Sequence, residues 1–356
     1  MRVAVVGVGL IGGSIGLATR ERLGAEVWGF DSSHDALRAA VERGALDRAC
    51  ASLPEALEHA EATFVAVPVG ALPDVVAAAL AASPADCVVT DVGSTKRAVV
   101  EASADPRFVG GHPLAGAESA GVEHARADLF DGATWYLTPT ATTQGLLYER
   151  LHRLLHTLGA RPAAIDPVTH DTVLAAVSHL PHVLANLLVW QAAGALGSPE
   201  EPLPATGPSF RDATRVAGAS GRIWTDIYLS NADALAVQIG RAIDRLDEVR
   251  AALKRGDASW IESWNEQAGA DRRRLRDGQL TRDELLELRV SVPNQPGVVA
   301  RIALALGRAG INISDMALHP APDMREGVIA LWIAGAQSAG RARELIEELG
   351  FPVTAL

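Results

Sequence analysis

A glycine-rich turn near the start of the chain restricts its fold more than any other feature. The segment Gly7-Val8-Gly9-Leu10-Ile11-Gly12-Gly13 follows an apolar run at 3–6, typical of a buried strand, and precedes a helical pattern at 14–22. A second strand pattern at 26–30 ends in Asp31, nineteen positions after Gly12. This order of strand, glycine turn, helix, strand and acid predicts a Rossmann-type dinucleotide-binding domain.

Each glycine of the turn has a physical reason for its position. Gly7 permits the tight turn, Gly9 lets the backbone approach a pyrophosphate, and Gly12 lets helix and strand pack closely. The backbone amides at the start of the helix would face the phosphates. Asp31 would accept hydrogen bonds from the ribose hydroxyls and repel a 2′-phosphate, which favours NAD over NADP. The alternative is a glycine turn with a purely structural role.

The composition indicates a soluble enzyme of two or three domains. The chain has 356 residues, of which 48% are hydrophobic, enough for a sizeable core. Its net charge of −11 argues against nucleic acid or an anionic membrane as a partner. Cys50 and Cys87 show no pairing pattern, so we expect a reducing, cytoplasmic compartment. The uncharged stretch 3–19 contains five glycines and is a poor apolar helix, so we expect no targeting or transmembrane segment there.

Residues 1–165 alternate short β-rich runs with helical stretches, the pattern of a parallel α/β sheet. Ligands of such sheets bind beyond the carboxyl ends of the strands. Polar residues gather there, because Asp91-Val92-Gly93-Ser94-Thr95-Lys96 follows one strand pattern and Gly111-His112-Pro113 follows another. The expected strands are Arg2–Val6, Glu26–Phe30, Ala62–Val67, Cys87–Thr90, Phe108–Gly110, Thr134–Leu137 and Pro162–Ile165.

His112 is the candidate general base. The pKa of an ordinary histidine lies near ~6.5, which suits removal of a hydroxyl proton as hydride leaves the same carbon. Ser94 is the natural partner to orient the imidazole by a hydrogen bond. The alternative for His112 is an ordinary loop residue. Lys96 could serve substrate or cofactor, or lie on a solvated helix face.

The sequence pattern of residues 166–281 predicts a nearly all-helical domain. Asp166-Pro167 resembles the N-cap and first position of a long helix. That helix carries His170, Asp171, His179 and His182, and its residues 183–190 are apolar on nearly every face. Such a helix must be buried, and a partner subunit is the natural cover, so we expect a homodimer. His179 and His182 are one turn apart, but no third ligand is evident, so we expect no metal and a substrate-pocket role for at least one of them.

Two further segments complete the organisation of the chain. Arg211 and Arg215 lie four residues apart on one helical face, where either could clamp a substrate carboxylate or form a surface ion pair. Residues 276–281 resemble a linker. Residues 286–356 have the order βαββαβ, an α+β ferredoxin-like arrangement.

Five motifs in this order resemble the prephenate dehydrogenase family, including its relatives that use arogenate, over essentially the whole chain. The motifs are Gly7-Val8-Gly9-Leu10-Ile11-Gly12-Gly13-Ser14, Asp91-Val92-Gly93-Ser94-Thr95-Lys96, Gly110-Gly111-His112-Pro113-Leu114-Ala115-Gly116, Ser178-His179-Leu180-Pro181-His182 and Phe210-Arg211-Asp212-Ala213-Thr214-Arg215. The C-terminal domain resembles an ACT domain, a small-ligand sensor. The resemblance implies three domains: a Rossmann domain at 1–165, a helical substrate and dimerisation domain at 166–281, and an ACT domain at 286–356.

The resemblance also assigns roles to residues. It implies that His112 is the base that contacts the ring C4 hydroxyl and that Ser94 orients it and touches the nicotinamide. It implies that Arg215 binds a substrate carboxylate. Substrate contacts are further expected from His182, His179 and the ligand-discriminating Glu118. The expected cofactor-binding residues are Gly7, Gly9, Leu10, Ile11, Gly12, Asp31, Val67, Pro68 and Ser94.

The implied activity is the oxidative decarboxylation of prephenate with NAD, in tyrosine biosynthesis. L-tyrosine is the expected effector of the ACT domain, at an interface between two ACT domains. Its expected binding residues are Asn294, Gln295, Gly297, Asn312 and Ile313. Three alternatives remain: an arogenate dehydrogenase, a 3-hydroxyacid dehydrogenase, and a non-catalytic regulator that binds NAD and an amino acid. The second usually needs a lysine in the helical domain, where only Lys254 is present. The third has no reason to keep His112, Ser94 and Arg215 together.

Overall fold

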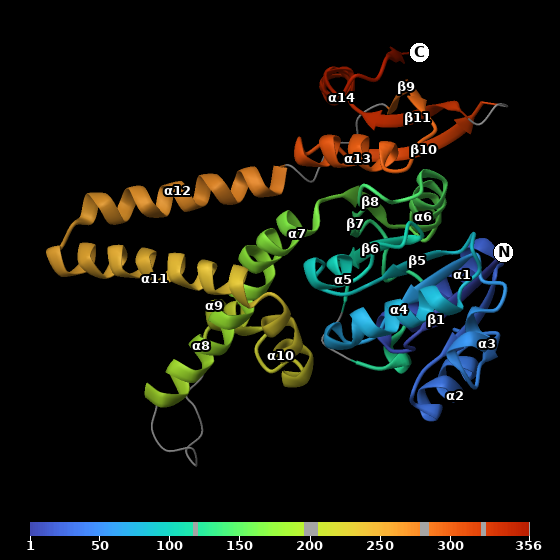
Figure 1. Cartoon of the computed structure of the whole chain (residues 1–356). Coiled ribbons are helices and arrows are strands. Elements are labelled where there is room, and N and C mark those ends of the chain that lie inside the picture. Colours follow the sequence, from blue (N-terminus) through green and yellow to red (C-terminus); the bar gives the residue numbers. More distant parts are fainter. Residues whose placement is uncertain (117–119, 196–205, 278–284, 322–324, 356) are drawn as a thin grey trace. The chain divides into compact units, whose positions relative to one another are not determined.

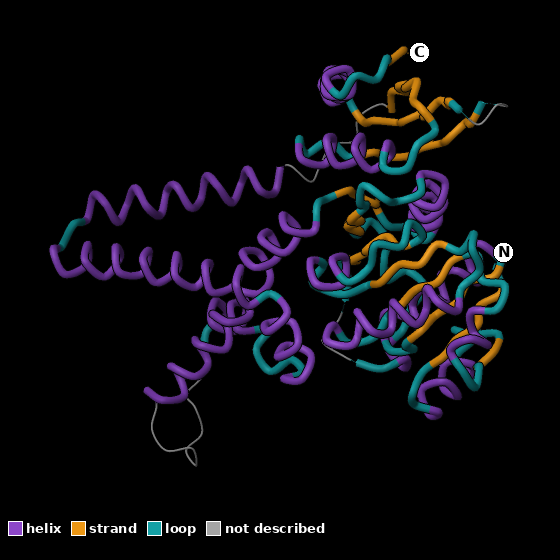
Figure 2. Tube along the Cα trace, in the orientation of Figure 1, coloured by secondary structure: helices purple, strands orange, loops and turns teal. Residues whose placement is uncertain are grey.

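The computed structural model describes residues 1–116, 120–195, 206–277, 285–321 and 325–355 (Figure 1). Their contacts form two compact units. The first comprises Met1–Leu174, Gly218–Ser230 and Leu285–Leu356, and the second comprises Ala175–Ala217 and Asn231–Glu284. The first unit holds both sheets, whereas the described part of the second is helical (Figure 2).

The N-terminal sheet has eight strands in the order β3-β2-β1-β4-β5-β6-β7-β8. The middle strands β4 and β5 are fully buried and β1 is buried beyond Arg2, as expected of valine-rich parallel strands covered on both faces. The strands predicted from sequence are confirmed to within a few residues, and the two-residue edge strand β3 was not predicted. The strands are β1 (Arg2–Val6), β2 (Glu26–Phe30), β3 (Arg48–Ala49), β4 (Ala62–Val65), β5 (Val88–Asp91), β6 (Phe108–Pro113), β7 (Thr134–Thr138) and β8 (Arg161–Ala164).

The helices of this domain begin with recognisable signals. Ser33 caps α2 by accepting a hydrogen bond from the Ala36 amide, and α4 has a proline in its first turn. In contrast, Gly9 precedes α1 without a side-chain cap. The helices are α1 (Leu10–Leu23), α2 (His34–Glu42), α3 (Leu53–Leu57), the 3-10 turn η1 (Val69–Ala71), α4 (Leu72–Ala82), α5 (Arg97–Glu101), the 3-10 turn η2 (Val122–His124) and α6 (Gly145–Thr157).

One part of this sheet differs from the expected all-parallel arrangement. β6 and β7 are antiparallel, and β6 continues through Pro113, so that His112 lies within the strand, opposite Tyr136. The prediction ended this strand at Gly110 and placed His112 in a loop. A parallel connection requires a long crossover, usually a helix. The described residues between β6 and β7 form only the three-residue turn η2, so the chain returns antiparallel.

The C-terminal domain is a four-stranded antiparallel sheet in the order β10-β11-β9-β12, which confirms the predicted ferredoxin-like arrangement. It belongs to the same compact unit as the nucleotide-binding domain because their cores merge: Leu151 and Leu154 of α6 and Ile302 and Leu306 of α13 share one buried cluster. The elements are β9 (Leu285–Pro293), α13 (Val298–Arg308), β10 (Ile313–Pro320), β11 (Glu326–Ala334), α14 (Ala336–Glu348) and β12 (Val353–Ala355).

The middle of the chain is helical, as predicted. Asp166 accepts a hydrogen bond from the Thr169 amide at 2.9 Å, which confirms it as the cap of α7. A π-helix (Ala175–His179) separates α7 from α8, just before Pro181. Proline lacks an amide and clashes with the carbonyl four residues back, so the wider turn accommodates it. The helices are α7 (Pro167–Leu174), α8 (Leu180–Ala195), α9 (Pro208–Thr214), α10 (Gly221–Ser230), α11 (Ala232–Arg255) and α12 (Ala258–Asp277).

The run Pro167–Gly194 is long and apolar enough to cross a membrane, and 28% of its most apolar window is buried. Length and composition alone do not separate a membrane span from the core helix of a soluble protein. Residues Leu187 to Trp190 of α8 are exposed apolar side chains, with Trp190 at 75%. This part of α8 lacks the cover that the sequence pattern predicts.

Candidate active site

The glycine turn has the geometry predicted for a dinucleotide site. Gly7 has a φ of +91°, and a Cβ on it would lie 2.4 Å from the Ala66 carbonyl oxygen. A Cβ on Gly12 would lie 2.0 Å from the Gly7 oxygen, so this position brings the helix close to the turn. At Gly9, by contrast, no atom lies within 4 Å of a Cβ position, which leaves open space beside the backbone. The turn therefore fits a pyrophosphate at Gly9.

The end of β2 is tied to the same turn. One Asp31 oxygen accepts a hydrogen bond from the Val8 amide at 2.7 Å, and the other accepts one from the Ser33 amide at 2.8 Å. A carboxylate has about four acceptor positions, so Asp31 can still accept bonds from ribose hydroxyls. The first turn of α1, which contains Leu10 and Ile11, has no acidic residue to repel a phosphate. After β4, Val67 is half-buried and Pro68 is exposed.

Helix α10 packs against two of the loops that follow the strands. Asp226 lies 3.5 Å from a Cβ position at Gly70, in the turn after β4. The Ser230 hydroxyl lies 3.0 Å from the hydroxyl of Thr95, in the loop after β5. The sequence placed residues 218–230 in the helical domain, whereas their contacts place them with the nucleotide-binding domain.

His112 is buried and belongs to a polar chain of three side chains. Its Nδ1 lies 2.9 Å from Nε2 of His170, and Nδ1 of His170 lies 2.8 Å from the Asp171 carboxylate. Asp171 also accepts hydrogen bonds from the amides of Lys96, at 2.7 Å, and Arg97, at 3.0 Å. Burial opposes ionisation of Asp171, but these hydrogen bonds outweigh it and hold its pKa below the usual value. Burial lowers the pKa of His170.

A buried ion pair lies at the end of β5. The Lys96 ammonium donates to the Asp91 carboxylate, and both side chains are fully buried. Asp91 also accepts hydrogen bonds from the amides of Gly93, at 2.8 Å, and Gly111, at 3.1 Å. Burial lowers the pKa of Lys96, and the negative charge of Asp91 opposes this shift. The pair therefore fixes β5 against the residue that precedes His112.

Two further predicted residues are Ser94 and Glu118. Ser94 is half-buried in the loop after β5, and among the described residues no hydrogen bond joins it to His112. Its orienting role stays a prediction. Glu118 lies outside the described residues.

The helical unit brings together three of the predicted substrate residues. His179, in the π-helix, lies with its Nδ1 3.2 Å from Nδ2 of Asn231, and both side chains are buried. His182 contacts Asn186, and burial lowers its pKa while a backbone hydrogen bond with Val216 opposes the shift. Arg215, directly before Val216, is exposed at the end of α9. A π-helix often marks a functional site.

The described residues contain no group of three or more histidine, cysteine, aspartate or glutamate side chains that could hold a metal ion. The structure connects His170 and Asp171 to His112. The sequence analysis gave neither His170 nor Asp171 a role in the site. The signal present in the sequence was the His170-Asp171 pair itself, three residues after a predicted helix start.

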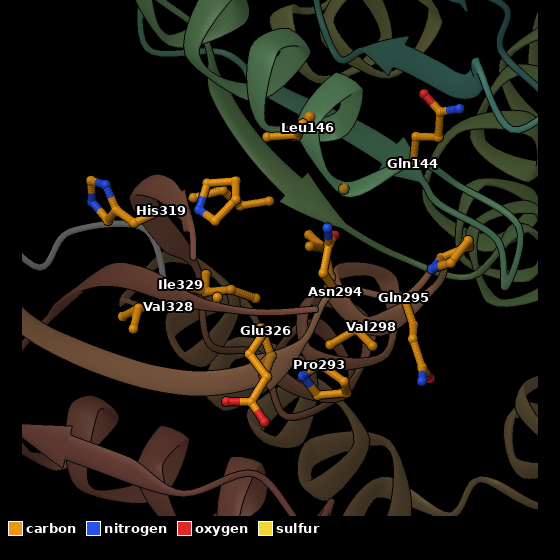
Figure 3. Close-up of a pocket in the computed structure, with 17 residues that line it drawn as sticks. Gln144, Leu146, Pro293, Asn294, Gln295, Val298, His319, Glu326, Val328 and Ile329 are labelled. Atoms are coloured by element: carbon orange, nitrogen blue, oxygen red, sulfur yellow. The ribbon is translucent and has the colours of Figure 1, made fainter. Parts of the chain in front are cut away.

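A second candidate site lies between the C-terminal domain and α6. It is a cavity of about 210 Å³, lined by Gln144 and Leu146 of the nucleotide-binding domain on one side and by Asn294 and Gln295 of the loop after β9 on the other (Figure 3). Its apolar lining includes Val298 and Ile329, and its polar lining includes His319 and Glu326. Asn294 and Gln295 were predicted to bind an effector.

The other predicted effector residues do not line this cavity. Gly297 packs on the nucleotide-binding domain, where a Cβ on it would lie 2.2 Å from the Ala141 oxygen. Asn312 is exposed, and the Ile313 side chain is buried in the core. The expected site between two ACT domains stays a prediction.

Family models of known proteins match three successive segments of the chain. The family model described as "Prephenate dehydrogenase, nucleotide-binding domain" matches residues 15–163, and "Prephenate dehydrogenase, dimerization domain" matches residues 166–266. "ACT domain" matches residues 286–350. A prephenate dehydrogenase of Bacillus subtilis is 30% identical over 97% of this chain and 95% of its own length. The chain belongs to the prephenate dehydrogenase family.

Solved structures of this family share the fold. The crystal structure of prephenate dehydrogenase from A. aeolicus, in complex with hydroxyphenyl propionate and NAD+, has a TM-score of 0.72 and 28% identity. It covers 77% of this chain and 98% of its own. Arogenate dehydrogenase from Synechocystis has a TM-score of 0.68 and 28% identity, over 77% of this chain and 100% of its own. The family thus includes structurally similar members named for two different substrates.

Proposed function

We propose that this protein oxidises and decarboxylates prephenate to 4-hydroxyphenylpyruvate with NAD+ as the oxidant. The observation that carries the proposal is the buried His112 in β6, next to the end of β5 in a sheet that has a dinucleotide turn after β1. Family membership, and a solved relative that holds NAD+ and hydroxyphenyl propionate, support the same assignment.

The chain's own residues divide the work as follows. The turn at Gly9 and the start of α1 hold the pyrophosphate, and Asp31 receives the ribose hydroxyls. His112 accepts the proton of the C4 hydroxyl, since a neutral imidazole is a good base near neutral pH. Arg215 binds a substrate carboxylate, and His182, Glu118 and His179 contact the remainder of the substrate.

The reaction balances with these groups and bound NAD+. The hydroxyl proton passes to His112, hydride leaves C4, and the C1 carboxylate departs as CO₂ with its bonding electrons left in the ring. Bound NAD+ supplies the hydride acceptor. The ring becomes aromatic, so the step is effectively irreversible. The products are 4-hydroxyphenylpyruvate, CO₂ and NADH.

Initial rates with prephenate and with arogenate, each with NAD+ and with NADP+, test this proposal. We expect the highest kcat/KM for prephenate with NAD+. A higher value for arogenate would make this chain an arogenate dehydrogenase, as in the Synechocystis neighbour. No reduction of either cofactor with either substrate would leave a non-catalytic regulator.

We infer that the protein acts as a cytoplasmic homodimer. The exposed apolar residues Leu187, Leu188 and Trp190 of α8 lie within the segment that matches the dimerization domain. Sedimentation velocity would show a dimer, and Trp190→Glu would shift it toward monomer. A wild-type monomer at micromolar concentration would contradict this inference.

We further propose that L-tyrosine inhibits the enzyme from the cavity between α6 and the ACT domain. The apolar lining suits an aromatic ring, Glu326 suits an ammonium group, and amides at the start of α6 suit a carboxylate. Inhibition requires that tyrosine bind two conformations of the enzyme unequally. The alternative is an ACT domain that is purely structural.

A further inference from the structure

The hydrogen bonds around His112 carry an inference about two residues with no assigned role. We propose that His170 and Asp171 are positioning residues that hold His112 in the tautomer required of the general base. The inference rests on the proposed function for the role of His112. What it predicts, which ring nitrogen of His112 carries the proton, can be measured without assaying catalysis.

The donors and acceptors in this series of hydrogen bonds are set by the Asp171 carboxylate at its end. The Asp171 carboxylate only accepts hydrogen bonds, so Nδ1 of His170, 2.8 Å away, must carry the proton. A neutral histidine has one protonated nitrogen, so Nε2 of His170 holds a lone pair. Nδ1 of His112, 2.9 Å from that lone pair, must then donate. Nε2 of His112 is therefore left as the acceptor, the state that a base needs.

Asp171 is itself held in place by the backbone. The amides of Lys96 and Arg97 donate to its two oxygens, at 2.7 and 3.0 Å. The carboxylate therefore cannot rotate away from His170 without losing both bonds. The backbone at the start of α5 thus holds Asp171, and through Asp171 and His170 it positions His112.

Other charged groups nearby do not reverse the donors and acceptors in the hydrogen bonds that join His112, His170 and Asp171. Asp91 and Lys96, at the end of β5, form a buried ion pair with each other, so their opposite charges largely cancel at His170. Tyr136, opposite His112 on β7, packs its ring perpendicular to that of His170, with centroids 5.7 Å apart. Of the described titratable groups around His170, Asp171 accepts the hydrogen bond of its Nδ1.

A nuclear magnetic resonance experiment on the full-length protein, labelled with ¹⁵N-histidine, tests the tautomer directly. The His112 signals are identified as those lost in His112→Asn. We expect the ¹⁵N pattern of a neutral ring protonated at Nδ1. A wild-type His112 protonated mainly at Nε2 at neutral pH would overturn the proposal, whatever the activity of the enzyme.

His170→Phe tests the consequence for catalysis, because it keeps a ring and removes both nitrogens. We expect kcat to fall by roughly 10- to 10⁴-fold, the upper end being the loss that follows when a catalytic histidine is left in the wrong tautomer. KM should change little. The acid limb of kcat/KM should move to lower pH, because protonated His112 loses its acceptor. A fall in kcat with that limb unmoved, or an unchanged kcat, would contradict a positioning role.

The matched control is His152→Phe, which changes another buried histidine of the same unit, in α6, whose Nε2 bonds to the Ile313 carbonyl. It should keep the wild-type kcat and pH profile. If His170→Phe does not fold, the wild-type tautomer still decides the proposal. A wild-type enzyme inactive on both prephenate and arogenate would contradict the proposed function. The tautomer of His112 would still be decided by the ¹⁵N measurement.

Discussion

His152 of α6 donates a hydrogen bond from Nε2 to the backbone oxygen of Ile313 in β10, 3.2 Å away. The bond joins the nucleotide-binding domain to the ACT domain inside one merged core. The His152 ring is buried, and burial lowers its pKa to about 4. Nδ1 of His152 has no hydrogen-bond partner among the described residues, so a proton added there would be buried without an acceptor.

We predict that this contact makes the protein less stable in mild acid. The folded pKa of about 4 lies below the unfolded value of 6.5, so the unfolded chain binds the proton first as the pH falls. Stability is retained above pH 6.5 and lost as the pH falls toward 4. The loss from pH 7 to pH 5 should be about 2 kcal/mol in the free energy of unfolding. Urea unfolding at both pH values measures it.

His152→Gln is the matched variant for that experiment. Glutamine keeps an amide donor for the Ile313 carbonyl but does not titrate. The variant should lose less stability than the wild type between pH 7 and pH 5, by about the amount assigned to His152. Equal losses in the two proteins would assign the acid sensitivity to other groups.

Local sequence patterns predicted some elements closely. β1 and β2 have the predicted bounds, because each is a charged residue followed by four uncharged, mostly apolar residues, and the first ends at the glycine turn and the second at Asp31. The roles of Gly7 and Gly12 were also predictable, since only glycine tolerates a neighbouring carbonyl oxygen at the Cβ position.

Long-range pairing could not be predicted in the same way. The antiparallel pairing of His112 with Tyr136 depends on the path of the chain between β6 and β7, which leaves no local periodicity. The hydrogen bond from His112 to His170 joins residues 58 positions apart, so the sequence showed both histidines but not their contact. Without that contact, the sequence indicated Ser94 as the partner of His112, because Ser94 follows the end of a neighbouring strand.

His112→Asn should retain cofactor binding and lose turnover. Asparagine cannot accept the hydroxyl proton, and a general base is typically worth roughly 10²- to 10⁴-fold in rate. Stopped-flow or steady-state NADH absorbance measures kcat, and fluorescence titration measures the Kd of NADH. An unchanged kcat would move the base elsewhere, with His182 as the first candidate.

Arg215→Gln should weaken binding of the substrate or of its transition state. Arg215 is exposed, so we expect only the cost of losing hydrogen bonds to a charged group, a fall in kcat/KM for prephenate of roughly 10- to 100-fold. Arg211→Gln, on the same short helix, is the control and should have a much smaller effect. If both variants are as active as the wild type, Arg215 is a surface arginine.

Asp31→Ala should relax the choice of cofactor toward NADP. The substitution removes the carboxylate that would repel the 2′-phosphate and contact the ribose. The ratio of kcat/KM for NAD+ to that for NADP+ should fall. Asp35→Ala removes a nearby carboxylate that pairs with Arg38 on α2, and it should leave the ratio unchanged. A wild-type ratio in Asp31→Ala would show that this carboxylate does not select the cofactor.

Leu146→Trp should reduce inhibition by L-tyrosine without changing the uninhibited enzyme. Leu146 lines the cavity from the first turn of α6, so a larger side chain would fill space that the effector needs (Figure 3). We expect the tyrosine concentration for half-inhibition to rise about tenfold or more, equivalent to ~1.4 kcal/mol of binding free energy. Leu23→Trp, at another partly exposed leucine that does not line the cavity, is the control. Inhibition that is competitive with prephenate and equal in both variants would place tyrosine at the active site instead. No inhibition of the wild type would leave the ACT domain structural, or a sensor of a different ligand.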